Sequence, residues 1–305
     1  MALPVEQGVP TVVPQEWTHK ANAKEVLCDR WWRTGPDSFT VTAPWPEVHG
    51  FYLTRHGLYD PLLLDETIRQ ALPVISHAAY DVPLGHQLIW HDFHWALCPD
   101  ALAIGETPVG IELRITCSHV TYRGARAAGV SLRVEALHDG VSLGSARTRY
   151  GIQSRAVYER LRGRCTDVAA ANARALPLPS PAPAVPAGRE NFDDVVLCCA
   201  DSANRWQLRV DTAHPVLFNH PVDHAPDMLL LEAARQAAHT PAHPRPVVVA
   251  AMDMVFTRDA ELDAPCCLKA ETLPDDLVGR ARVRVVGHQI GDDVFTSVLT
   301  LATVG

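Results

Sequence analysis

Lysine is scarce in this 305-residue chain: Lys20, Lys24 and Lys269 are its lysines, and the rest of its 27 basic residues are arginines. The 35 acidic residues bring the formal net charge to −8. This balance argues against a dedicated nucleic-acid binder, which usually presents a basic surface. No run approaches the roughly 18 apolar residues of a membrane span, and the first residues lack the basic and apolar stretches of a secretory signal. We therefore expect a cytoplasmic protein that binds neither nucleic acid nor membrane.

Motifs for metals and nucleotides are also lacking. The eight cysteines form no CxxC pair, which argues against structural zinc, and without an export signal we expect their thiols to be reduced. His91 and His94 fall on opposite faces of a predicted strand, which argues against a shared metal. Neither GxxxxGK[ST] nor GxGxxG occurs. We predict no metal and no cofactor.

A proline-rich stretch is the clearest organisational mark. Five prolines lie between Pro177 and Pro186, alternating with Ala, Leu and Ser. Such a run cannot supply ladder hydrogen bonds and favours an extended, semi-rigid spacer. It predicts an N-terminal unit over residues 1–165, a Pro/Ala-rich linker over 166–190 and a C-terminal unit over 191–305.

The two units share a repeated segment. PLLLDETIRQA at 61–71 and DMLLLEAARQA at 227–237 align at a constant offset, which superposes Glu66 on Glu232 and Arg69 on Arg235. Both segments predict helices that end near Pro73 and Pro241. Strand-like runs precede each helix, at SFTVTAP and RWQLRVD, and several follow it, beginning at HDFHW and MDMVF. An antiparallel sheet wrapped around one helix, occurring twice, predicts an α+β fold.

With these motifs the chain resembles the A-factor biosynthesis (AfsA-type) family of γ-butyrolactone autoregulator synthases. The resemblance lies in HGFY, YDPLLLDETIRQA and HPVDHAPDMLLLEAARQA, and in the double-unit length. It implies a tandem double hotdog fold, an internal pseudo-dimer. It also implies an acyltransferase that condenses a β-ketoacyl group, carried by an acyl carrier protein, with dihydroxyacetone phosphate. The product would lead to a butenolide-type signalling molecule.

Glu232 and Arg235 are the first candidates for this chemistry. Glu232 lies among apolar helix residues, so burial is expected to raise its pKa and suit it to act as the base. Arg235, three residues on, shares its helix face and could hold the acceptor phosphate or orient Glu232. The alternative is an intrahelical ion pair that only satisfies two buried charges.

Further candidates lie around the two helices. Backbone N–H groups near Asp227 and Met228 could polarise the thioester carbonyl. Asp227 replaces the family's usual Gly and could cap the helix or obstruct the thioester. His220 and His224 are catalytic candidates by resemblance to hotdog dehydratases. Gln236 and the first-unit pair Glu66 and Arg69 complete the predicted substrate contacts.

Several alternatives remain open. The enzyme could be a related furan-type autoregulator synthase or a hotdog dehydratase or thioesterase, and a catalytically silent acyl-binding protein would differ in class. Acyl length and the presence of a working site in the first unit are undetermined, and the chain could act as a monomeric pseudo-dimer or as a homodimer.

Overall fold

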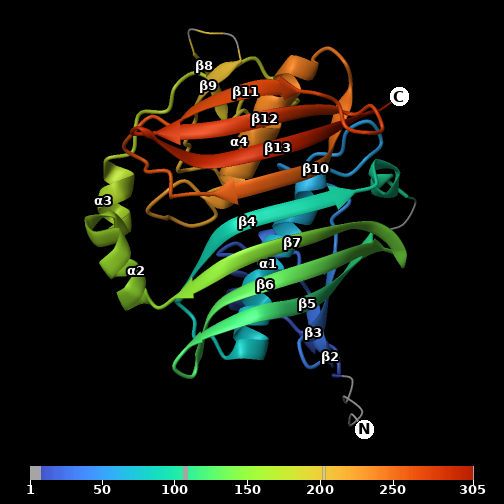
Figure 1. Ribbon diagram of the computed structural model, residues 1–305, viewed down its shortest axis with the longest axis vertical. Helices are drawn as coiled ribbons and strands as arrows, with labels where there is room; N and C mark the ends of the chain where they lie inside the picture. The colour runs from blue at the N-terminus through green and yellow to red at the C-terminus, as the bar shows by residue number, and fades with distance from the viewer. Residues whose placement is uncertain (1–7, 106–108, 201, 203, 305) are drawn as a thin grey trace. The chain divides into compact units, whose positions relative to one another are not determined.

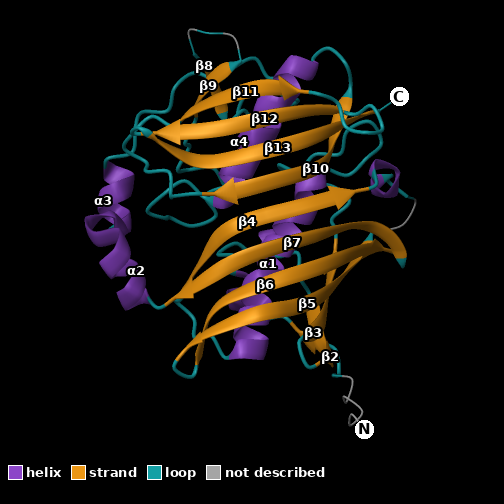
Figure 2. Cartoon of the chain, viewed as in Figure 1, coloured by secondary structure: helices purple, strands orange, loops and turns teal. Residues whose placement is uncertain are grey.

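Two compact units make up the chain, the first ending at Tyr158 and the second beginning at Glu159. The computed structural model describes residues 8–105, 109–200, 202 and 204–304 (Figure 1). Each unit contains one central helix and an antiparallel sheet (Figure 2).

The sheet of the first unit follows the order β1-β2-β3-β5-β6-β7-β4. All of its neighbouring strands are antiparallel. Apolar and polar side chains alternate along the longer strands, so that one face is buried, as with Leu113 and Ile115 on β5. The strands are β1 (Thr11–Val12), β2 (Arg30–Gly35), β3 (Ser38–Pro44), β4 (Gln87–Leu97), β5 (Gly110–Arg123), β6 (Arg126–His138) and β7 (Val141–Gln153).

The sheet of the second unit follows the order β10-β13-β12-β11-β9-β8 and repeats this arrangement. Its strands β9, β11, β12, β13 and β10 take the places of β3, β5, β6, β7 and β4, respectively, in the first sheet. Strand β10 follows the central helix of its unit, as β4 does. The strands are β8 (Leu197–Cys199), β9 (Arg205–Leu208), β10 (Val247–Phe256), β11 (Cys267–Leu273), β12 (Ala281–Gln289) and β13 (Asp292–Thr303). The predicted repeat is thus visible as two sheets of the same strand order.

The central helix of the first unit is longer than predicted. Helix α1 (Pro61–Tyr80) continues through Pro73 instead of ending there. Proline removes one backbone hydrogen bond from a helix interior. However, Val74, Ile75, Ser76 and His77 beyond it are all buried, and their packing favours continuation. The predicted stop was therefore wrong by about two turns.

In the second unit, helix α4 (Asp227–His239) ends before Pro241 as predicted. It packs on β11, β12 and β13, and residues 228–238 are all buried. The buried face of the sheet opposite it includes Leu268, Val285 and Leu299. Apolar burial at about 25 cal/mol per Å² is the main force holding helix to sheet.

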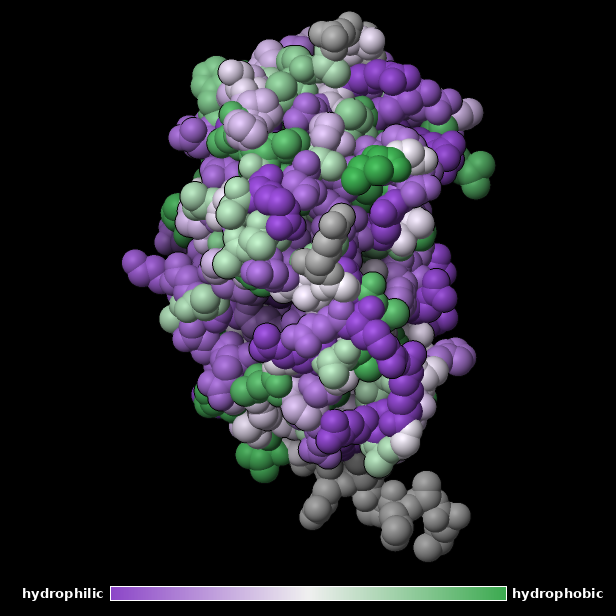
Figure 3. All heavy atoms as spheres, turned by 90° about the vertical axis from the view of Figure 1, so that its left-hand side faces the viewer, coloured by the Kyte–Doolittle hydropathy of each residue, from purple (hydrophilic) through white to green (hydrophobic). Residues whose placement is uncertain are grey.

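The segment predicted as a linker lies against the second unit. The backbone N–H of Ala182 donates to the Leu197 carbonyl at 2.7 Å, and that of Leu176 to the Leu262 carbonyl at 2.9 Å. Helix α2 (Arg155–Arg162) precedes it, and the short helix α3 (Val168–Ala173) lies within its first residues. On the side of the molecule shown in Figure 3, hydrophobic side chains are scattered among hydrophilic ones. Among the described residues, no helix is long and apolar enough to cross a membrane.

Candidate active site

A buried ionic cluster surrounds Glu232 on α4. One carboxylate oxygen accepts from Nε of Arg189 at 2.9 Å and from Nη2 of Arg235 at 2.7 Å, and the other accepts from Nε of Arg235 at 3.0 Å. Gln236 also donates to the carboxylate. The side chains of Glu232, Arg189 and Arg235 are only 0%, 2% and 6% exposed. Two guanidinium groups thus share one carboxylate away from water.

The pKa of Glu232 is lower than usual, contrary to the sequence prediction. Burial alone would raise this pKa, but the charges of Arg189 and Arg235 and the hydrogen bonds to the carboxylate outweigh burial and lower it. The prediction was wrong because Arg189 lies 43 residues upstream, where no helix spacing reveals it. Glu232 is therefore ionised and saturated with donors. Such a group is suited to orienting cations, not to accepting a proton.

The side chain of Gln236 binds the backbone of residues 194–196 and holds this segment against α4. Its Oε1 accepts from the Val196 N–H at 2.9 Å, and its Nε2 donates to the Asp194 carbonyl at 2.8 Å. Both ends of the amide are thus engaged by backbone. Its predicted contact with substrate stays a prediction.

The first unit contains the same arrangement on α1. Glu66 contacts Lys20 at 3.0 Å, Arg69 at 2.8 Å and Gln70 at 2.7 Å. Gln70 accepts from the Leu27 N–H and donates to the Glu25 carbonyl, both at 2.8 Å. We call each set of two cations, one glutamate and one glutamine a clamp. The sequence prediction missed the second cation in both units. The available signal was its spacing, because Lys20 lies five residues before Glu25 and Arg189 lies five residues before Asp194.

The start of α4 differs from the predicted cap. Pro226 occupies the N-cap position and Asp227 is the first helical residue, so Asp227 does not cap the helix. In α1 the N-cap is Asp60, whose Oδ1 accepts from the Leu62 N–H at 2.9 Å. Asp227 still lies in the first turn, where its charge complements the helix dipole. Met228 is buried. The predicted polarisation of a thioester by backbone N–H groups near these two residues stays a prediction.

The two predicted histidines lie in different surroundings. His220 is exposed. His224 binds Asp223 through Nδ1 at 2.8 Å, and its Nε2 lies 3.7 Å from Asp259. Burial would lower the pKa of His224, but these two carboxylates outweigh burial and raise it. Because an ionised carboxylate only accepts, Asp223 places the ring proton on Nδ1, so that in the neutral ring Nε2 is a proton acceptor.

Arg162 ties this histidine to the rest of the second unit. Its guanidinium lies 3.5 Å from Asp223, 3.1 Å from Asp259 and 2.5 Å from Glu261.

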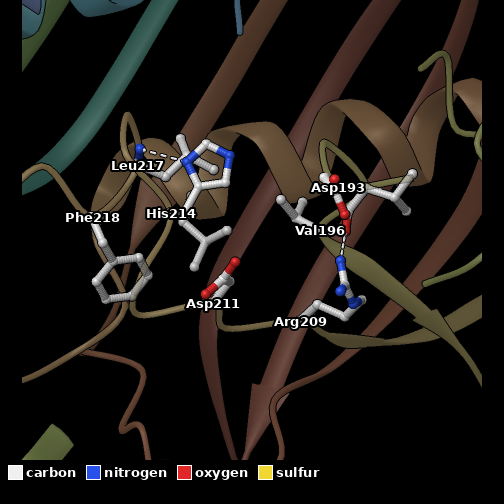
Figure 4. A pocket seen from close by; sticks show the side chains of 9 residues that line it. Asp193, Val196, Arg209, Asp211, His214, Leu217 and Phe218 are labelled. Carbon is white, nitrogen blue, oxygen red and sulfur yellow. Dashed lines mark hydrogen bonds between the residues drawn. The ribbon is translucent and has the colours of Figure 1, made fainter. Parts of the chain in front are cut away.

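His214 lines a small pocket beside α4 that the sequence did not reveal (Figure 4). Its Nδ1 accepts from the N–H groups of Val216 at 3.2 Å and Leu217 at 3.1 Å, so the neutral ring carries its proton on Nε2. Burial lowers the pKa of His214 and favours this neutral form. The pocket residues are Asp193, Val195, Val196, Arg209, Asp211, His214, Leu217, Phe218 and Leu229.

Arg209 is the cation of this pocket. It is buried, and it donates to the carbonyls of Pro179 and Val195. His49 makes the same turn in the first unit, where its Nδ1 accepts from Phe51 and Tyr52. That repeat, HGFY against HPVL, was the available signal for His214. Within the described residues, no group of three or more His, Cys, Asp or Glu could hold a metal ion.

Two solved structures with a similar fold are thioesterases. The 12:0-ACP thioesterase from Umbellularia californica has a TM-score of 0.51 at 9% identity, covering 87% of this chain and 94% of that one. An acyl-ACP thioesterase from Bacteroides thetaiotaomicron has a TM-score of 0.50 at 10% identity, covering 87% and 98%. At such identities the likeness shows the fold alone, and it confirms the predicted α+β hotdog fold.

Comparison of sequences is more specific. A 2-oxo-3-(phosphooxy)propyl 3-oxoalkanoate synthase from Streptomyces virginiae is 41% identical over 289 residues, 95% of this chain and 97% of that protein. An enzyme of the same name from Streptomyces coelicolor is 38% identical over 291 residues, 94% and 91% of the two chains. The model of the A-factor biosynthesis hotdog domain matches residues 1–152 and 170–304. The chain belongs to this A-factor biosynthesis hotdog family.

Proposed function

We propose that this protein is a 2-oxo-3-(phosphooxy)propyl 3-oxoalkanoate synthase, acting in the cytoplasm. It would transfer a 3-oxoacyl group from the thioester of an acyl carrier protein to the hydroxyl of dihydroxyacetone phosphate. The observation that carries the proposal is the 41% identity to a synthase of that name over nearly the full length of both chains.

The reaction needs a base and a donor to the carbonyl oxygen. The acceptor hydroxyl oxygen forms a bond to the acyl carbon while the carbon–sulfur bond breaks. The hydroxyl proton passes to the base and then to the departing sulfur. No covalent intermediate with the enzyme is required, and neither helix motif contains a cysteine.

His224 is the residue that we assign as the base. Its Nδ1–H is held by Asp223, so in the neutral ring Nε2 is the nitrogen that would accept the hydroxyl proton. Because its pKa is raised, the reaction rate should increase with pH as His224 loses its proton.

We assign His214 as a hydrogen-bond donor, in contrast to the proton acceptor His224. Its Nε2–H is a donor, because Nδ1 is occupied by two backbone N–H groups. Such a neutral donor can stabilise the oxyanion that forms at the thioester carbonyl. Val196, Leu217, Phe218 and Leu229 supply apolar surface in the same pocket.

The clamp around Glu232 is assigned a supporting role. Of the two roles considered for Arg235, orienting Glu232 fits its two hydrogen bonds to that carboxylate better than holding phosphate. The clamp would fix α4 relative to the segment that carries Val195 and Val196, two pocket residues.

Incubation with a 3-oxoacyl thioester and dihydroxyacetone phosphate, followed by mass spectrometry, tests the proposal. A phosphorylated ester or butenolide is expected. His224→Ala should lower kcat by about 10²–10⁴-fold, whereas His288→Ala, which removes an exposed histidine on β12, should not change it. Release of free 3-oxo acid would indicate a thioesterase. Dehydration of a hydroxyacyl thioester would indicate a dehydratase, and binding without turnover a silent acyl-binding protein.

A further inference from the structure

The sheet of the second unit has an exposed face that is rich in cations. Buried residues on β11 and β12, such as Leu268, Ala270, Val283 and Val285, alternate with exposed or half-buried ones. Side chains on a strand point alternately to the two faces, so the exposed set lies on the face turned away from α4, which is the face seen in Figure 1. Four cations belong to this face: Arg205 on β9, Lys269 on β11, and Arg282 and Arg284 on β12.

The strand register places these cations close together. Lys269 lies opposite Arg205 on one side and Val286 on the other. Arg284 lies opposite Glu271, and Arg282 opposite Leu273. Neighbouring strands are about 4.8 Å apart and alternate residues about 6.8 Å apart along a strand. The four cations therefore cover an area of roughly 10 by 14 Å, with Glu271 as the anion among them.

The charge of this face is not neutralised. No carboxylate of the described residues lies within 4.0 Å of a cationic nitrogen of the four. In the first unit, two strand arginines have such partners, since Arg114 pairs with Glu112 at 2.7 Å and Arg149 pairs with Asp92, whereas Arg133 and Arg147 lie opposite each other. Like charges directly opposite on paired strands, as Arg205 and Lys269 are, cost stability. The chain as a whole has a net charge of −8, whereas this face is positively charged. The repulsion between its cations lowers the stability of the fold.

We propose that this face docks the acidic acyl carrier protein that delivers the 3-oxoacyl thioester. The inference rests on the proposed function. A sheet face is a broad surface and not the concave pocket that a small molecule requires, and its extent exceeds that of one phosphate group. A nucleic acid is disfavoured because the surplus is three charges in an acidic chain. Complementary charge on an acidic protein mainly increases the rate of association.

The test compares one 3-oxoacyl group on three donors: the carrier protein, coenzyme A and uncharged N-acetylcysteamine. The doubly reversed variant Lys269→Glu/Arg282→Glu is measured against the parent. We expect KM for the carrier-linked donor to rise about tenfold, with kcat unchanged and KM for the N-acetylcysteamine donor unchanged. Higher ionic strength should weaken the parent's use of the carrier-linked donor and affect the variant little.

Arg133→Glu/Arg147→Glu is the matched control. Arg133 and Arg147 are exposed strand arginines of the first unit that lie opposite each other, so reversing both changes net charge by the same amount as the double variant without touching the proposed surface. An equal effect of the control, equal effects on all three donors, or no effect on the carrier-linked donor would overturn the proposal. A change confined to the coenzyme A donor would also overturn it, by assigning the face to a small anion.

Direct titration of the parent chain with acyl carrier protein separates this proposal from the proposed function. If no donor gives transfer, the function is wrong, whereas the docking surface is still tested by binding. Binding that is weakened by Lys269→Glu/Arg282→Glu and not by Arg133→Glu/Arg147→Glu supports the surface. Absence of binding by the parent contradicts it.

Discussion

At the scale of single residues, the decisive finding is that the helix glutamates are ionised in the core. The sequence correctly indicates a Glu–Arg pair on each helix, because three-residue spacing places both side chains on one face. It does not show the second cation, since Lys20 and Arg189 are brought to the glutamates by tertiary folding. Arg189 has the largest effect among the groups that lower the pKa of Glu232, and Arg235 and the hydrogen bonds to the carboxylate add to it.

Acid should weaken the first clamp in a defined range. Burial would raise the pKa of Glu66, but Arg69 and Lys20 outweigh burial and lower it from 4.5 to about 2. The ionised carboxylate therefore stabilises the fold fully above pH 4.5, and this contribution is lost as the pH falls towards 2.

We expect Glu66→Gln to be less stable than the parent at neutral pH, and the difference to shrink as the pH falls through this range. Urea unfolding at a series of pH values measures it. Glu47→Gln, at an exposed position outside the strands and helices, should match the parent throughout. A difference between Glu66→Gln and the parent that stays constant with pH would show that Glu66 does not titrate as described.

At the scale of elements, the alternation of apolar and polar residues predicted the strands well. Strands β3 to β7 and β9 to β13 were all indicated by the sequence. Strands β1, β2 and β8 were missed, since two of them have only two or three residues and the burial pattern of β2 does not alternate. In α1, the packing of buried residues overrode the local preference of Pro73.

The attachment of the segment around Val196 to α4 should depend on one amide. Gln236→Leu leaves the Val196 N–H and the Asp194 carbonyl without their partner inside the protein. Each buried polar group left unsatisfied costs about 1–3 kcal/mol, so we expect a loss of roughly 2–5 kcal/mol in the free energy of unfolding.

Hydrogen exchange should show the loss locally, because the Val196 amide proton should exchange faster in the variant than in the parent, while the amides of the neighbouring strands change less. Gln207→Leu, at a half-buried position on β9, serves as the control with little change expected. Unchanged protection of Val196 would mean that Gln236 does not hold this segment.

At the scale of the whole molecule, one architecture occurs twice while the chemistry that we propose occurs in one copy. His49 and His214 make equivalent turns, but His49 lies 3.4 Å from the carboxylate of Glu25, whereas His214 lines the pocket. Both units therefore keep the turn in which a histidine Nδ1 accepts from two backbone N–H groups, and this turn is a feature of the fold. The sequence alone could not separate scaffold from site, because both histidines precede a helix in the same way.

Parallel substitutions should reveal this asymmetry. His214→Ala is expected to lower kcat by about 10²–10³-fold through loss of an oxyanion donor. His49→Ala should instead lower stability by about 1–3 kcal/mol and leave the kcat of the folded protein unchanged. Steady-state kinetics and thermal unfolding of both variants measure the two effects. The opposite pattern would place the working site in the first unit.

The position of Arg189 has a consequence for dividing the chain into fragments. A fragment that began at residue 191 would contain all of α4 and the sheet, yet Glu232 would lose one of its two buried cations. It would also lack Pro179 and Ala182, whose backbones bind Arg209 and Leu197. The proline-rich segment, which looks dispensable as sequence, thus supplies part of the second core. The shortest self-sufficient second half must begin before Leu176, whose N–H binds the Leu262 carbonyl.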